Sequence, residues 1–252
     1  ESLFDSIATE VPALVEEGPL VSPALEATVE SLLPLATKLP EMSIPTPDLG
    51  GLPVPSAGQL LTDTYFYDDL SNNDMGWWEP AADEISEHKW EDGAYTILVK
   101  QPEYVAWTDV PVDFNPTGAE FDAWVPAGGQ GGSFGLICLK QSDEDYYYVE
   151  MDISDQTYSI GHYLNGEYQA LTSPEWPSTN VLRTGSEVNH VLATCEVDQI
   201  TLLINSEFVD LVSLPEQAVP GEMAVFGSTW DDMPADGYKV YFDNFNAWVP
   251  VQ

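Results

Sequence analysis

Two long segments of the chain, residues 132–171 and 188–212, consist of short β-prone runs separated by tight polar turns. Each segment contains one of the only two cysteines, Cys138 or Cys195, in the middle of a predicted strand. Closely spaced strands with no helical pattern between them are typical of antiparallel sandwiches and jelly rolls. The sequence therefore predicts an all-β domain, and the strand cysteines favour an oxidising compartment.

The predicted β domain runs from residue 61 to residue 252. Polar turns separate its strands, and Asn165-Gly166 is the strongest signal because this dipeptide is typical of two-residue hairpins. The predicted strands are residues 64–70, 94–100, 119–125, 133–140, 146–153, 158–164, 168–171, 189–196, 199–204, 208–212, 223–227 and 239–249.

Alternation along residues 146–153 assigns two faces to that strand, because successive side chains point to opposite sides of a sheet. One face is expected to lie in the core and carries Tyr147, Val149, Met151 and Ile153. The other is expected to be a solvent-exposed face with two aromatic rings and two carboxylates, namely Tyr146, Tyr148, Glu150 and Asp152.

The two cysteines predict one disulfide, Cys138–Cys195, with two buried free thiols as the alternative. The sequence begins at Glu1 and shows no signal peptide, so we expect an exported protein whose signal has been removed. No run of 18 apolar residues is present, which predicts that no segment spans a membrane. The expected location is extracellular or on the cell surface.

The charge is strongly one-sided, with 43 acidic residues against 6 Lys and Arg and a formal net charge of −37. Such a surface repels nucleic acids and anionic lipids, so neither is an expected partner. It attracts cations, and two explanations stay open. The carboxylates are a salt-adapted or extracellular acidic surface, or some of them bind Ca²⁺ specifically.

Residues 1–39 are predicted to form two short helices that mediate assembly or anchoring, and residues 40–60 a Pro/Gly-rich linker. Each helix has one apolar stripe, which is too small to stabilise an isolated helix and must pack on a partner. The expected partner is another copy of the chain, in a homo-oligomer or filament. The stripe residues are Phe4, Ile7, Val11 and Leu14 in the first helix, and Leu25, Val29, Leu32 and Leu39 in the second.

Four sequence stretches carry a family resemblance: GLICLKQSDEDYYYVEM, YSIGHYLNGEYQAL, NHVLATCEVDQITLLINSEFV and YFDNFNAW. Together they resemble the concanavalin A-like (LamG-like) jelly-roll domains of bacterial secreted and cell-surface proteins, near the 3-keto-disaccharide hydrolase-like subgroup. The resemblance covers about residues 64–249. It implies that the opening strand around residues 66–70 pairs with the closing strand around residues 242–245. It does not imply one function, since lectins, glycosidases and adhesive modules share this fold.

The clearest catalytic candidate is the carboxylate series Glu150, Asp152 and Asp155. It resembles the E-x-D-x-x-E signature of concanavalin-fold β-glucanases, in which two carboxylates flank the scissile bond. Here the third position is an aspartate where the chain turns, and strand alternation would place it opposite Glu150. The expectation is a solvated acidic strand face without catalytic residues. No CxxC, HExxH or Walker motif is present.

Aromatic residues beside turns are candidates for glycan binding, because sugar rings stack on flat aromatic faces that have polar neighbours. The alternative is that they are core or interface residues. The carbohydrate-binding candidates are Tyr146, Tyr148, Trp176 and Trp230.

Side-chain oxygens near the expected pairing of the first and last strands are candidates for a Ca²⁺ site, because this ion needs six to eight oxygen ligands. The expected cofactor is none, or Ca²⁺ at these residues. The candidate ligands are Asp68, Asp69, Asn72, Asp74 and Asp243.

These patterns favour a non-enzymatic, extracellular structural protein that assembles or anchors through residues 1–39 and displays an acidic lectin-like sandwich. The first alternative is a carbohydrate-binding module that uses the aromatic candidates. The second alternative is a glycoside hydrolase that uses Glu150.

Overall fold

The computed structural model of this chain describes residues 62–80, 82–126 and 130–250. The helices predicted for residues 1–39 and the linker at 40–60 lie outside these ranges. The described residues form β-strands and loops, and they contain no helix that is long and apolar enough to cross a membrane.

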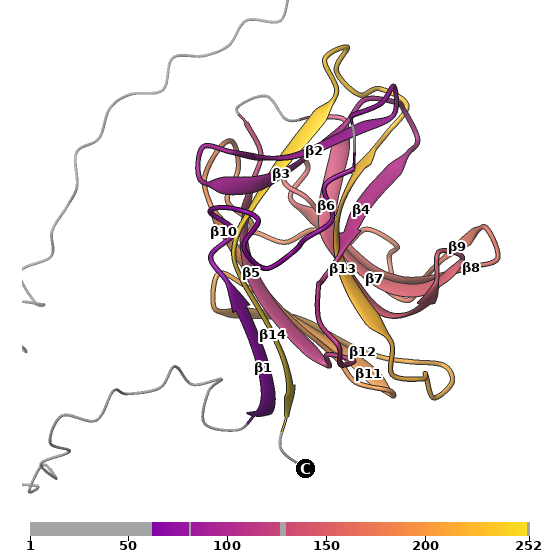
Figure 1. Ribbon diagram of the computed structural model, residues 1–252. Helices are drawn as coiled ribbons and strands as arrows, with labels where there is room; N and C mark the ends of the chain where they lie inside the picture. The colour runs from indigo at the N-terminus through magenta and orange to yellow at the C-terminus, as the bar shows by residue number, and fades with distance from the viewer. Residues whose placement is uncertain (1–61, 81, 127–129, 251–252) are drawn as a thin grey trace, which may run out of the picture. The chain divides into compact units, whose positions relative to one another are not determined.

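Two antiparallel sheets pack face to face, and Figure 1 shows them as two layers. The eight-stranded sheet has the order β12-β11-β10-β5-β14-β3-β2, and β1 also pairs with β14. Its strands are β1 (Thr62–Asp68), β2 (Ser86–Glu91), β3 (Ala94–Val99), β5 (Gly118–Trp124), β10 (Asn189–Cys195), β11 (Gln199–Ile204), β12 (Glu207–Ser213) and β14 (Tyr238–Pro250).

The second sheet has six strands in the order β4-β13-β6-β7-β8-β9. Its strands are β4 (Val105–Asp109), β6 (Gly132–Ser142), β7 (Asp145–Asp152), β8 (Thr157–Leu164), β9 (Glu167–Ala170) and β13 (Glu222–Thr229). Neighbours far apart in sequence, such as β13 beside β6, are typical of a jelly roll. The predicted fold class, an antiparallel jelly-roll sandwich, is therefore confirmed.

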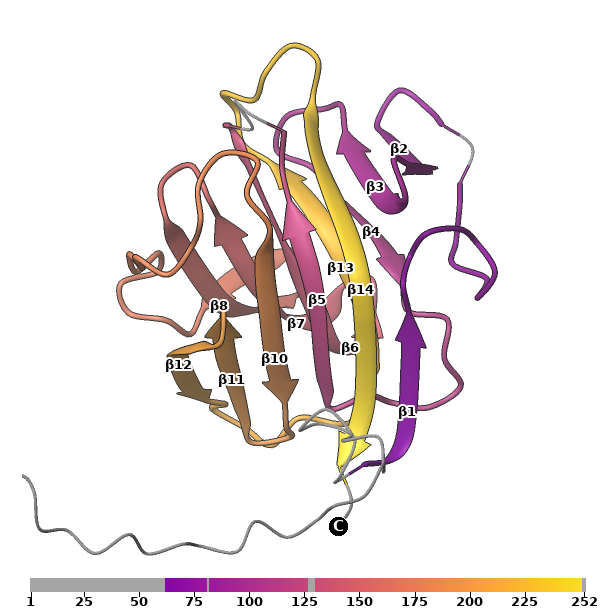
Figure 2. The ribbon, with the colours of Figure 1, turned by 90° about the vertical axis from the view of Figure 1, so that its left-hand side faces the viewer.

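The long strand β14 organises the eight-stranded sheet (Figure 2). It pairs with β5 on one side, and with β3 and then β1 on the other. A bulge interrupts its pairing with β5 between Asp243 and Asn246, where Asn244 has a φ of 50°. The predicted pairing of the opening and closing strands is confirmed, with Asp68 opposite Phe245.

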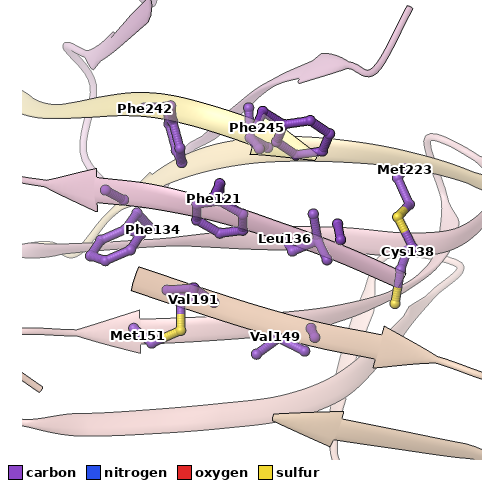
Figure 3. Close-up of a cluster of buried hydrophobic side chains, with 14 of the residues drawn as sticks. Phe121, Phe134, Leu136, Cys138, Val149, Met151, Val191, Met223, Phe242 and Phe245 are labelled. Atoms are coloured by element: carbon purple, nitrogen blue, oxygen red, sulfur yellow. The ribbon is translucent and has the colours of Figure 1, made fainter. Parts of the chain in front are cut away.

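Phenylalanine rings from both sheets fill the core (Figure 3). Phe121 and Phe242 of the eight-stranded sheet lie 5.7 Å apart between ring centroids, and Phe134 of β6 approaches Phe242 edge-on. Cys138 of β6 and Cys195 of β10 form a buried disulfide that joins the two sheets. The predicted disulfide is therefore present, and the free-thiol alternative is wrong.

Turn chemistry accounts for the hairpins. Asn165 and Gly166 both have positive φ, 53° and 88°, as the primed turns of two-residue hairpins require. The same geometry occurs at Asp92 and Gly93, which join β2 to β3. The sequence analysis did not predict β2, because its residues SEHKWE are mostly polar and only one is fully buried.

The other strand missing from the prediction is β4, an edge strand of five residues. Its inward side chains are Ala106 and Thr108, which are small or polar, while Trp107 points to the opposite face and is only partly buried. The hydrophobic alternation that marks a half-buried strand is therefore weak in this segment.

The faces predicted for β7 are correct, but the predicted exposure of one face is wrong. Its inward residues belong to the main core, as expected. The outward residues are also buried, because aromatic side chains from neighbouring strands and loops cover them. The buried outward residues are Tyr146, Tyr148, Glu150 and Asp152.

Candidate functional site

The candidate site lies on the outer face of the six-stranded sheet, the face turned away from the sandwich core. Across β13, β6, β7 and β8, the residues in register are Phe226, Gly135, Glu150 and Ser159. A Cβ atom at Gly135 would lie 2.8 Å from the Phe226 ring and would collide with the backbone. The glycine therefore lets an aromatic ring lie against the sheet beside Glu150.

The next two rows of this face carry four tyrosine rings. Tyr148 is paired with Gly161 on β8, and its ring end occupies the space that a side chain at Gly161 would need. The ring meets Tyr168 of the edge strand β9 at 5.7 Å between centroids. Tyr163 packs against Tyr168 at 4.6 Å and stacks on Tyr146 at 5.0 Å. These rings form a continuous aromatic wall along the sheet.

Two loops add indole rings to this face. Trp230 directly follows β13, and its backbone N–H donates to the backbone carbonyl of Gly131 at 2.9 Å. Trp176 lies in the long loop between β9 and β10, where the hydroxyl of Thr172 donates to the carbonyl of Glu175 at 2.6 Å. The two indoles meet edge to face, with ring centroids 5.4 Å apart and planes at 89°.

A groove with two compartments runs past this tryptophan pair. Trp176, Trp230 and Asp231 line both compartments, which have volumes of about 360 Å³ and about 590 Å³. We call the smaller one the inner compartment and the larger one the outer compartment. The other inner residues are Glu103, Val105, Tyr148, Glu150, Tyr168, Glu175, Ser228 and Thr229. The other outer residues are Gln130, Gly131, Asp152, Ser154, Asp155, Thr157 and Asp232.

Glu150 lies in the wall of the inner compartment and is only 7% exposed. The hydroxyl of Ser133 donates a hydrogen bond to its Oε1, and Ser228 is a second hydroxyl partner. Burial raises the pKa of Glu150 to about 7 despite these two hydrogen bonds, and the nearby charges of Asp152 and Glu175 act in the same direction. Near neutral pH this carboxyl group can therefore hold or release a proton.

The other two members of the carboxylate series lie in the outer compartment. Asp152 ends β7, and its Oδ1 accepts hydrogen bonds from the N–H and the hydroxyl of Ser154 at 2.8 Å and 2.7 Å. Asp155 lies in the turn that follows and is exposed. The alternation argument that placed Asp155 opposite Glu150 is wrong, because the strand has already ended and Asp155 borders the same groove as Asp152.

Three of the four predicted glycan-binding residues come together in the inner compartment: Tyr148, Trp176 and Trp230. The fourth, Tyr146, does not line either compartment. It is 3% exposed and packs with Ile137 in a small apolar cluster on the same face of the sheet. The ring of Tyr146 stacks on that of Tyr163, so Tyr146 has a structural role in this face of the sheet.

Sequence analysis missed seven lining residues of the inner compartment: Glu103, Val105, Tyr168, Glu175, Ser228, Thr229 and Asp231. Glu175 and Asp231 directly adjoin the nominated tryptophans, so the same turn signal could have identified them. Tyr168 could be found from the hairpin, since the tight turn places β9 beside β8. No local signal indicates Glu103, which comes from the loop before β4.

The candidate calcium ligands lie near the pairing of β1 with β14, and most of them already accept backbone hydrogen bonds. Asp68 is buried and uses both oxygens, accepting from the N–H of Leu70 at 2.9 Å and from the indole of Trp77 at 2.7 Å. Within the described ranges, no three His, Cys, Asp or Glu side chains are grouped so that they could hold a metal ion. Ca²⁺ binding stays a prediction. In the rest of the set, Asp69 accepts from Ser71, Asn72 accepts from Asp74, and Asp243 accepts from Asn244.

The sequence matches no protein-family model and none of the curated proteins. Solved structures do resemble the fold. A Bacillus subtilis protein of unknown function with a galectin-like fold has a TM-score of 0.54 at 10% identity, covering 74% of this chain and 96% of its own. The Bacillus licheniformis β-glucanase has a TM-score of 0.52 at 12% identity, covering 73% and 98%.

An endo-acting O-glycanase of the human gut microbiota is similar to the same degree, with a TM-score of 0.51 at 11% identity, covering 74% of this chain and 99% of its own. Together these likenesses show that the chain has a concanavalin A-like jelly-roll fold, as the resemblance implied. At such low identity they show the fold alone, so any function must be argued from the groove.

Proposed function

We propose that this protein is a carbohydrate-binding module whose site is the groove on the outer face of the six-stranded sheet. The observation that carries the proposal is the convergence of Tyr148, Trp176 and Trp230 on one cavity, from β7 and from two separate loops. Tyr168 extends this aromatic lining. Flat aromatic rings beside polar groups are the surfaces on which sugar rings stack.

The size and the polarity of the groove support a sugar ligand. The inner compartment of about 360 Å³ is within the range of small-ligand sites. Hydroxyl and carboxylate groups, among them Ser228, Thr229 and Glu175, lie beside the rings and can accept hydrogen bonds from sugar hydroxyls. The outer compartment continues past the tryptophan pair, so a chain of sugars could extend through both.

The proposal predicts that glycan binding depends on the two indoles of the groove. On a glycan array, the double variant Trp176→Ala/Trp230→Ala should lose at least about tenfold in affinity. The reason is that stacking of a sugar on one aromatic ring contributes on the order of 1 kcal/mol or more. The control is Trp78→Ala, which removes an exposed tryptophan that lies outside the groove. Equal binding by the double variant and the wild type would contradict the proposal, as would the absence of any glycan ligand.

A second candidate function is glycoside hydrolysis, and one observation favours it. Glu150 has a pKa raised to about 7 by burial and lies in the wall of the inner compartment, where a general acid would be needed. A second carboxylate is also required, and Glu103, Glu175 and Asp231 line the same cavity. Fold similarity to a β-glucanase and an O-glycanase agrees with this candidate but does not establish it.

We expect binding without cleavage, because the carboxylate series is divided between the two compartments, with Glu150 in the inner one and Asp152 and Asp155 in the outer one. Incubating the glycans that bind best with the wild type should release no new reducing ends above the level of Glu150→Gln. Cleavage that Glu150→Gln abolishes while glycan affinity is retained would make the hydrolase the correct function.

The remaining functional predictions concern cellular context. The disulfide supports an exported, extracellular protein, because disulfides persist in oxidising compartments. Self-assembly or anchoring through residues 1–39 concerns a part of the chain that the structure does not describe, and it stays a prediction. The 3-keto-disaccharide hydrolase-like subgroup likewise stays a prediction.

A further inference from the structure

The charged side chains that line the groove, within the described part of the chain, are all of one sign. Four carboxylates line the inner compartment and four line the outer one, with Asp231 common to both. Among the described residues that line the two compartments, none is Lys, Arg or His. Low-dielectric walls around charges of one sign focus the field of a cleft and raise the local concentration of ions of opposite charge.

The lysines of the described residues pair with acids outside the groove, and Arg183 donates to the carbonyl of Val188. Lys89 and Lys239 pair with Glu91 at 2.6 Å and 3.0 Å, on strands β2 and β14 of the eight-stranded sheet. Lys140 pairs with Asp109 at 2.9 Å on the six-stranded sheet. None of the ion pairs within the described ranges involves a carboxylate of the groove. The negative charge of the groove is therefore left for a ligand to balance.

The aromatic rings of the groove favour the same kind of ligand. The face of an aromatic ring is its negative side and attracts ammonium groups, most strongly in the case of Trp. Trp176 and Trp230 lie at the junction of the two compartments, with Glu175 and Asp231 next to them in sequence. A ligand amine at this junction would meet ring faces and carboxylates together.

On the basis of the proposed glycan site, we propose that the groove selects glycans that carry free amino groups. The ligand class is oligosaccharides of unacetylated hexosamine, in which sugar rings stack on the indoles while protonated amines meet the groove carboxylates. Neutral glycans would bind by stacking and hydrogen bonds, without the attraction between amine and carboxylate. Glycans with carboxylate or sulfate groups would be repelled.

The test compares two oligosaccharides that differ only in this group. Chito-oligosaccharides of one length, either fully deacetylated or fully N-acetylated, are titrated into the full chain by calorimetry at a pH at which the amine is protonated. The deacetylated oligomer should bind at least about fivefold more tightly. Its advantage should shrink as salt is raised from about 0.05 M to about 0.5 M, since the Debye length falls over this range.

A matched pair of variants separates the groove from the general acidity of the protein. Glu175→Gln removes an exposed carboxylate of the groove and should reduce the preference for the deacetylated oligomer several-fold. Glu144→Gln removes an exposed carboxylate in the turn between β6 and β7, outside both compartments, and should leave the preference unchanged.

Each other outcome has a definite meaning. Equal affinity for the two oligomers would overturn the amine preference while the proposed glycan site stands. A preference that Glu144→Gln weakens as much as Glu175→Gln would also overturn it, because the attraction would then come from the whole surface. If neither oligomer binds and no other glycan does, both the preference and the proposed function fail.

Discussion

Removing the disulfide is expected to lower the free energy of unfolding by about 4 kcal/mol in the chain-entropy account of cross-links. The two cysteines are 57 residues apart, so the bridge restricts a long loop in the unfolded chain. It also joins β6 of one sheet to β10 of the other through the centre of the core. The measurement is urea unfolding of Cys138→Ala/Cys195→Ala against the wild type.

The wild type unfolded in the presence of a reductant is the matched control, because it loses the bridge and keeps both sulfur atoms. It should be destabilised by nearly as much as the double variant. A loss below about 1 kcal/mol in both cases would show that the bridge contributes little to the stability of the sandwich.

Replacing Glu150 with Gln is expected to stabilise the protein above neutral pH by up to about 3 kcal/mol, at about 1.4 kcal/mol per unit of pKa shift. The pKa of Glu150 is about 7 in the folded protein against an ordinary value of 4.5, so the folded state holds its proton more tightly than the unfolded state. Its contribution to stability is complete below about pH 4.5, falls as the pH rises, and is lost above about pH 7. Gln cannot ionise and keeps its stability across this window.

The difference in stability between Glu150→Gln and the wild type should therefore be small at about pH 4 and largest at about pH 8. Glu144→Gln, at an exposed position, is the control and should follow the wild type across the same range. A constant difference in stability between Glu150→Gln and the wild type at all pH values would mean that burial does not raise the pKa of Glu150.

Local patterns in the sequence were sufficient to predict the strands that bury one face. The alternation from Tyr146 to Ile153 assigns each side chain of β7 to the correct face, because pleating is a property of the strand alone. The disulfide was predictable for a related reason, since each cysteine lies within a strand whose inward residues are apolar. The edge strands β2 and β4 were missed because their fully buried positions hold polar or small residues, His88 in β2 and Ala106 and Thr108 in β4.

The candidate site depends on tertiary contacts that no local pattern contains. Alternation places Glu150 on an outward face, but its surroundings there come from residues far away in the chain, such as Phe226, which lines a small pocket with it, and Ser228, its hydrogen-bond partner. The sequence therefore suggested a solvated carboxylate where the structure has a buried one. Trp176 and Trp230 were nominated singly from their turn residues, and their edge-to-face contact follows from two loops that meet only in the fold.

The central claim is that glycans bind at the tryptophan pair of the groove, and the indole N–H signals of the protein test it most directly. The chain has 8 tryptophans, so a nitrogen–proton correlation spectrum should show one indole signal for each. Trp176→Phe and Trp230→Phe assign the two signals of the groove. On titration with the best glycan ligand, these two signals should move, and that of the exposed Trp78 should stay in place. Unchanged groove signals, with binding that is established independently, would place the ligand elsewhere and contradict the account.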